Sequence, residues 1–203
     1  MTKNELKERI ARALRERRAE LQAVTADIFA EPELGYKEVK TSAKVKAAFD
    51  KLGLEYTDGW AVTGVKARMK GRSSRRTVAM LGELDAIVCR DHPNADPVTG
   101  AAHCCGHNVQ IANMLAVAMA LKDSGAMEYL DGDVVVFAVP AEEYVEIDYR
   151  NGLRDAGKIR YLGGKQQLIY EGAFDDIDMA MQMHVDSTDN PDGWFVCGGS
   201  SNG

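Results

Sequence analysis

The amino-acid sequence predicts an α/β protein with a three-layer architecture, in which helices flank a mostly parallel sheet. Helix-like and strand-like segments alternate along its 203 residues, a pattern typical of layered α/β folds. Segment 133–139 is a continuous apolar run of the kind found in parallel strands that are buried on both faces. Polar residues able to bind a metal follow several predicted strands, where open α/β sheets place their sites.

The first predicted elements are two helices and two strands. One helix is expected over 3–30, because apolar residues recur there at helical spacing until Pro32. A second helix is expected over 42–52, where Gly53 suits the left-handed backbone of a helix end. Strands are expected at 61–70 and 77–81, joined by a short basic turn.

The remaining elements continue the alternation. Segment 89–106 is rich in Pro, Asp and Gly and predicts a loop, and 109–123 predicts an apolar helix. After the buried strand at 133–139, the polar segment 145–173 predicts short helices and loops over a site. The last strands are expected at 178–183 and 193–197. The polar Gly- and Ser-rich ending favours a truncated chain.

Composition and charge exclude several classes of protein. Hydrophobic residues make up 45% of the chain and charged residues 28%, which excludes a disordered protein. A formal net charge of −6 makes the chain a poor electrostatic partner for nucleic acid or an anionic membrane. No apolar run reaches the ~20 residues that span a bilayer, and no secretory signal is visible. A cytoplasmic protein with reduced cysteines is therefore expected.

Three segments carry the residues with metal-binding chemistry: 102–108, 139–143 and 182–186. Cysteine, histidine and glutamate side chains are all ligands for zinc or a similar divalent ion. Each segment alone is equally compatible with a buried histidine or with solvated acids. Their placement at the same end of one α/β sheet favours a metal site, since two adjacent carboxylates at a buried strand end are costly without a cation.

A cysteine hydrolase is a competing interpretation of the same residues. Cys105 would be the nucleophile, and His107 or His103 would be the base. This interpretation is less favoured, because it leaves the paired glutamates and His184 without a role.

Five ordered segments resemble those of M20-family metallohydrolases, in the branch of N-acyl-amino-acid, auxin-conjugate and aminobenzoyl-glutamate hydrolases. They are Glu33-Leu-Gly-Tyr-Lys-Glu38, Gly82-Glu-Leu-Asp-Ala86, His103-Cys-Cys-Gly-His-Asn108, Pro140-Ala-Glu-Glu143 and Met183-His184. The resemblance implies a zinc-peptidase-like catalytic domain. It places 1–203 as the amino-terminal portion of that domain, without the family's lid and dimerisation domain or its last metal-binding histidine.

The resemblance also implies roles for single residues. Four of them resemble the family's metal ligands: Cys105, His107, Glu143 and His184. Glu142 resembles the general base, and Asp85 is expected to orient a ligand histidine from nearby. The implied cofactors are two divalent ions of zinc, manganese or cobalt.

The reaction implied by the resemblance is hydrolysis of the amide bond in a small N-acyl or N-aroyl amino acid, similar to aminobenzoyl-glutamate. A metal-activated water would attack the amide, with Glu142 as general base. The expected partners are this small substrate and, for the parent protein, a second copy of itself. A truncated, catalytically inactive fragment that folds and at most binds metal remains the alternative.

Overall fold

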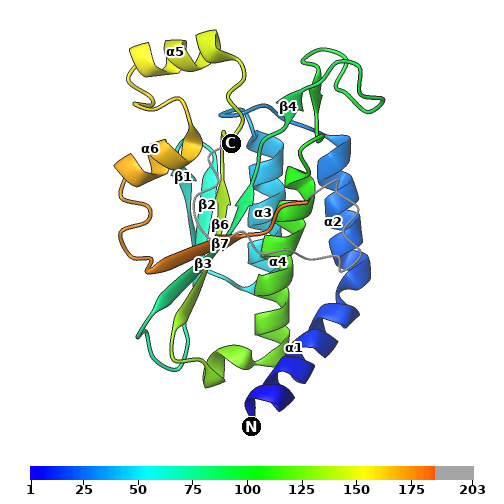
Figure 1. Ribbon diagram of the computed structural model, residues 1–203, viewed down its shortest axis with the longest axis vertical. Helices are drawn as coiled ribbons and strands as arrows, with labels where there is room; N and C mark the ends of the chain where they lie inside the picture. The colour runs from blue at the N-terminus through cyan, green and yellow to red at the C-terminus, as the bar shows by residue number, and fades with distance from the viewer. Residues whose placement is uncertain (186–203) are drawn as a thin grey trace.

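The computed structural model describes residues 1–185, and a five-stranded sheet runs through its centre (Figure 1). The strands are β1 (Tyr56–Trp60), β2 (Gly64–Met69), β3 (Thr77–Glu83), β6 (Asp133–Val139) and β7 (Met179–Gln182), and a separate two-stranded ribbon comprises β4 (Ile87–Val88) and β5 (Ala101–Ala102). The helices are α1 (Lys3–Glu16), α2 (Arg18–Ala30), α3 (Val39–Leu52), α4 (His107–Ser124), α5 (Ile147–Asp155) and α6 (Gly164–Tyr170), with a 3-10 turn, η1 (Ala126–Tyr129), after α4.

The central sheet is mixed, with the strand order β1-β2-β6-β3-β7. β3 pairs in parallel with both β6 and β7, whereas β1 with β2 and β2 with β6 are antiparallel. The α/β class and the layering are as expected, but the expectation of a mostly parallel sheet is wrong, because two of the four strand pairings are antiparallel and the parallel pairing is confined to β6, β3 and β7. The carboxyl ends of these three strands therefore meet at one edge of the sheet.

Strand β6 has a core on each of its faces. Val136 and Ala138 pack into the core beneath α3 and α4, and Val135 and Phe137 pack into the core beneath α6. Figure 1 shows α1 to α4 on one side of the sheet and α5 and α6 on the other. Burial on both faces explains why this strand lacks the polar-apolar alternation of a half-exposed strand.

The expected single helix over 3–30 is wrong, because the structure divides it into α1 and α2 at Arg17. The Arg17 guanidinium binds Asp123 at the end of α4, with Nε and Oδ2 2.6 Å apart, and also Glu20 in α2. Both helices pack on α4, so the helical spacing of apolar residues continues across the break.

Other differences lie in short or polar elements. β1 was not expected, because its sequence Tyr-Thr-Asp-Gly-Trp shows no apolar alternation, and it is an edge strand held by β2. β4 ends just before the loop expected over 89–106, and β5 lies within that segment, so the loop expectation is wrong at 101–102. The expected strand at 193–197 lies outside the described residues. Across residues 1–185, no helix combines the length and apolarity needed to cross a bilayer.

Candidate metal centre

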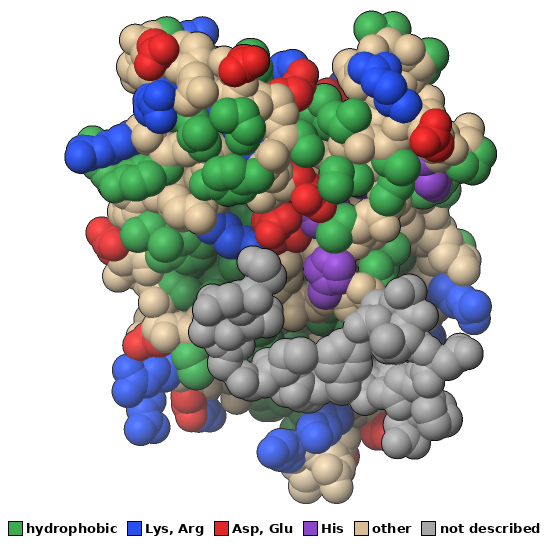
Figure 2. Space-filling view, turned by 45° about the horizontal axis from the view of Figure 1, so that its top comes forward, with side chains coloured by type: hydrophobic (Ala, Val, Ile, Leu, Met, Phe, Trp, Pro, Cys, Tyr) green, Lys and Arg blue, Asp and Glu red, His purple; other side chains and the backbone are tan. Residues whose placement is uncertain are grey.

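Four segments bring ligand-type side chains to the carboxyl edge of the parallel strands. Glu83 ends β3, Glu142 and Glu143 follow β6, His184 follows β7, and His107 begins α4. The parallel register of β3 with β6 pairs Glu83 with Val139, which sets the ends of these strands side by side. Figure 2 shows acidic and histidine side chains gathered on this face, with a basic side chain beside them.

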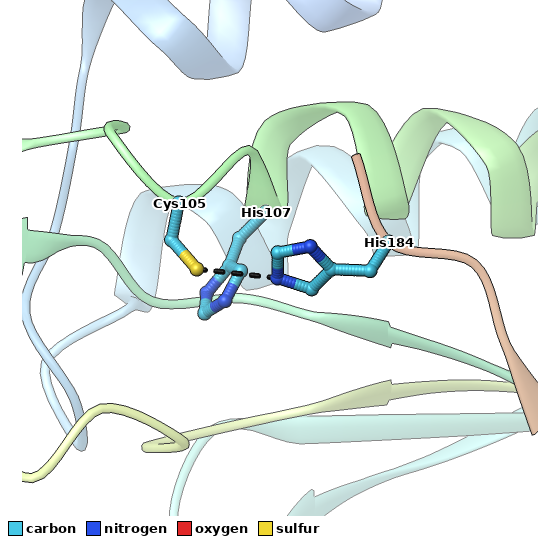
Figure 3. Close-up of side chains that lie close together, drawn as sticks. All are labelled: Cys105, His107 and His184. Atoms are coloured by element: carbon cyan, nitrogen blue, oxygen red, sulfur yellow. Dashed lines mark hydrogen bonds between the residues drawn. The ribbon is translucent and has the colours of Figure 1, made fainter. Parts of the chain in front are cut away.

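Cys105, His107 and His184 converge from different elements (Figure 3). The Cys105 Sγ lies 3.2 Å from Nε2 of His184, and the rings of the two histidines meet edge to face at 6.2 Å between centroids. One potential ligand atom from each of the three residues lies within 4.8 Å of the others. His184 Nδ1 lies 2.6 Å from the carbonyl oxygen of Val185, which leaves its Nε2 for the site.

The backbone that follows β3 holds the His107 ring on the side away from the site. Its ring is 1% exposed, and Nδ1 donates to the backbone carbonyl of Asp85 over 2.8 Å. A carbonyl only accepts hydrogen bonds, so the neutral ring keeps its proton on Nδ1 and presents the Nε2 lone pair to the site. No aligned hydrogen bond to this Nε2 forms among the described residues, although Glu83 Oε2 lies 3.0 Å away, and a nitrogen in this setting suits a metal ligand.

Three carboxylates surround the free nitrogen of His107. Glu83 Oε2 lies 3.0 Å from Nε2, Glu142 Oε2 3.9 Å and Glu143 Oε1 4.0 Å. Glu83 also accepts a hydrogen bond from Gln110 Nε2 over 2.8 Å and forms an ion pair with Lys165. The combined thiol, imidazole and carboxylate donors fit zinc or another divalent ion of similar softness.

The charges in this cluster shift the pKa values of its members. Burial opposes protonation of His107, but Asp85 and Glu83 outweigh it and raise the pKa of His107 to about 11. Burial and the charge of Glu83 raise the pKa of Glu142. Burial is also the main cause that raises the pKa of the Cys105 thiol, and it outweighs the opposing effect of His107. Without a cation, the site therefore holds protons on groups that a metal needs deprotonated.

Metal binding is expected to release about two protons per chain near neutral pH, one from His107 and one from Cys105. Calorimetric titration with zinc in buffers of different ionisation enthalpy measures this number directly. Cys105→Ser should reduce it by about one, because serine stays protonated at this pH. Binding heat that is independent of the buffer would contradict the expected proton release.

Comparisons with known proteins show which proteins the chain resembles. No family model matches the chain. The chain is 30% identical over 169 residues to a thermostable carboxypeptidase of Saccharolobus solfataricus, covering 81% of this chain and 38% of that one. It is 36% identical over 115 residues to an IAA-amino acid hydrolase of Arabidopsis thaliana, covering 55% and 26%. A dinuclear metal-binding peptidase of the M20 family from Bacillus subtilis superposes with a TM-score of 0.64 at 25% identity, covering 80% and 41%.

The chain belongs to the M20 family. It spans less than half the length of the relatives that it matches. The superposition on the M20 peptidase covers 80% of this chain. The central sheet and the helices on its two faces therefore share the fold of that peptidase.

The structure brings together all the residues that the sequence assigned to an M20 metal site. Cys105, His107 and His184 form one cluster, and Glu142 joins His107 and Glu83 in another. The two glutamates lie almost equally close to His107 Nε2: the distance is 3.9 Å for Glu142 and 4.0 Å for Glu143. The division of roles between the two glutamates therefore remains a prediction.

Other residues near the site were missed or set aside. Glu83 and Lys165 were given no role, although an acid at the end of an apolar strand was a visible signal. Asp85 lies behind His107, where it was expected. His103, treated as structural, is 6% exposed and makes no hydrogen bond among the described residues. Its burial lowers its pKa to about 4, so the ring is neutral at pH 7.

Proposed function

We propose that this M20-family protein is a metal-dependent amidohydrolase that cleaves the amide bond of small N-acyl or N-aroyl amino acids. The observation that carries the proposal is the convergence of Cys105, His184 and the free Nε2 of His107 beside paired glutamates. The donor set fits divalent ions, and a carboxylate with a raised pKa lies at its edge. Zinc, manganese and cobalt are the metals proposed.

Four residues would hold the metal ions: Cys105, His107, Glu143 and His184. Bound divalent ions lower the pKa of a water and polarise a carbonyl. Glu142 accepts the proton of the attacking water on a carboxylate oxygen and delivers it to the leaving amine. Its raised pKa suits this exchange near neutral pH, and its side chain is 38% exposed and thus open to a substrate.

The substrate class is supported by the chemistry named for a relative. The matching protein of Arabidopsis thaliana is named as a hydrolase of IAA-amino acid conjugates, which are amides of an amino acid. An aminobenzoyl-glutamate-like amide is the more specific proposal for this chain, and rests on the sequence resemblance. A homodimeric parent protein is proposed on the same basis. A cytoplasmic location is proposed because Cys104 and Cys105 are adjacent, which is a poor pattern for disulfides.

A cysteine hydrolase is the second candidate, favoured by the 3.2 Å contact between Cys105 Sγ and His184 Nε2. A nucleophilic cysteine needs a thiolate, whereas burial here raises the pKa of the Cys105 thiol. The candidate also leaves the three carboxylates around His107 unused. The metal site gives a role to two of them, Glu142 as base and Glu143 as ligand.

Hydrolysis of a panel of N-acetyl, N-benzoyl and aminobenzoyl amino acids tests the proposed function. Activity is expected only with divalent metal, should disappear on dialysis against a chelator, and should return when zinc, manganese or cobalt is added. Activity that survives the chelator but is lost to an alkylating agent would favour the cysteine hydrolase. Metal uptake without hydrolysis of any amide would favour a metal-binding chain without catalytic activity.

A further inference from the structure

The segment Ala141 to Glu143 carries both glutamates and has an unusual backbone. It leaves the end of β6 with Ala141 at φ 52°, a left-handed conformation that a residue with a Cβ adopts at a cost. Ala141 is fully buried. A strained backbone of this kind persists only where surrounding contacts hold it.

Four groups outside the segment hold the peptide groups on either side of Glu142, and two of them, Glu38 and Asp85, are far away in the sequence. The N–H of Ala141 donates to Glu38 Oε1 over 2.8 Å, and the carbonyl of Ala141 accepts from the N–H of Gly164 over 2.9 Å. The N–H of Glu143 donates to Asp85 Oδ2 over 2.9 Å, and the carbonyl of Glu143 accepts from Nη2 of Arg150. The segment is thus fixed at both of its ends.

Glu38 is a buried carboxyl group that contacts the start of this segment. It is fully buried, and its second oxygen accepts a hydrogen bond from Thr63 Oγ1 over 2.6 Å. Among residues 1–185, no lysine or arginine forms an ion pair with it. Burial raises the pKa of Glu38 to about 7, and no cation offsets the cost of burying its charge, so an ion pair does not explain the place of this carboxyl group.

Arg150 holds the other end of the segment, through the carbonyl of Glu143. Like Glu38, it has no partner of opposite charge in the described part of the chain. Its guanidinium is fully buried, donates from Nη1 to the carbonyl of Leu162 over 2.8 Å, and contacts Glu143 through Nη2. It lies over the rings of Tyr36 and Tyr144, at 5.4 Å and 5.8 Å from their centroids. A planar guanidinium can bind two carbonyls and two rings at once, which an ammonium cannot.

We infer that Glu38 and Arg150 are positioning residues, which hold the 141–143 backbone so that the carboxylates of Glu142 and Glu143 face the free nitrogen of His107. This inference rests on the proposed function. Neither residue touches the reacting atoms. Their effect on metal binding and turnover passes through the peptide groups that they hold, because the two glutamates lie only 3.9 Å and 4.0 Å from His107 Nε2.

The first test measures the segment itself and needs neither metal nor activity. Amide hydrogen exchange by NMR should show the N–H of Ala141 strongly protected in the parent chain. Glu38→Ala should reduce this protection by at least about tenfold, while Val135 and Phe137 in β6 keep theirs. Glu38→Gln should restore it, because the amide oxygen still accepts from Ala141 and the amide nitrogen can donate to Thr63.

The second test measures what the positioning does. Glu38→Ala should raise the Kd for zinc by about tenfold or more, and lower kcat with KM nearly unchanged. Glu38→Gln should restore both. Arg150→Met should act in the same direction. If Glu38→Ala does not fold, Thr63→Val removes only the hydroxyl that holds Glu38 and should weaken zinc binding in the same sense.

Asp133→Ala is the matched control. Asp133 is also a buried carboxylate, 3% exposed, and accepts from the backbone N–H of Gly71 over 3.0 Å, but at the opposite end of β6. It should lower the melting temperature without changing the zinc Kd or kcat. The inference is overturned if Glu38→Ala keeps the parent's Ala141 protection and zinc Kd, or if Asp133→Ala impairs zinc binding equally. A parent chain that binds zinc but hydrolyses no amide overturns the proposed function alone, since the exchange and zinc-binding tests still decide the inference.

Discussion

Glu142→Gln is expected to lower kcat by about 10²–10⁴-fold, the usual contribution of a general acid-base group, while the chain keeps its metal. The amide preserves the size of the side chain and its hydrogen-bonding shape, but it cannot take a proton from water. The raised pKa of Glu142 and its place beside His107 Nε2 are the reasons for this expectation. Steady-state kinetics together with metal analysis of the same samples measure both effects.

Glu143→Gln is the matched variant for this prediction, because its carboxylate lies equally close to His107. Glu143→Gln should weaken metal binding, so its turnover should recover when excess metal is added. The turnover of Glu142→Gln should stay low under the same conditions. Glu128→Gln, an exposed substitution in η1 far from the site, should change neither. Full turnover in Glu142→Gln, or recovery of that variant with added metal, would contradict the assignment of the general base.

His107→Ala is expected to have the largest effect on metal binding, with a loss of affinity of at least about 100-fold. The ring is buried, its tautomer is set by the carbonyl of Asp85, and three carboxylates face its free nitrogen. Removing it also leaves Glu83 and Asp85 buried without this neighbour, so the melting temperature should fall at neutral pH. Zinc titration in competition with a chromophoric chelator gives the affinity.

His92→Ala is the control for this second prediction. His92 lies in the loop between β4 and β5, where its Nδ1 accepts from the N–H of Asn94 and its ring packs against Phe29. Its removal should leave the zinc affinity within about twofold of the parent, as expected for a surface change away from the site. Zinc affinity that is unaffected by His107→Ala would contradict the metal centre described here.

The sheet and the convergence of the site were predictable because each depends on short-range patterns. A strand buried on both faces shows as an apolar run, and 133–139 was predicted with the bounds that β6 has. Residues that follow parallel strands meet at one edge of a sheet, so 139–143 and 182–186 were expected to lie together. Cys105 and His107 open α4 instead, and the resemblance to M20 enzymes placed them beside His184, where they lie. Neither pattern requires knowledge of the tertiary packing.

The remaining features depend on contacts between residues far apart in sequence. Glu38 reaches Ala141 across 103 positions, and Lys165 reaches Glu83 across 82, and no periodicity marks such pairs. Arg17, at the break between α1 and α2, forms an ion pair with Asp123, 106 positions away. β1 is formed because β2 offers an edge, not because its own sequence favours a strand.

Metal content per chain, measured by mass spectrometry on protein purified without chelator, tests the central claim most directly. The control is the double variant Cys105→Ala/His107→Ala, which removes two of the three donors of the cluster. Near-stoichiometric zinc, manganese or cobalt in the parent, lost in the double variant, is the expected result. Absence of metal from the parent, or equal metal in both proteins, would contradict a metal centre built from these residues.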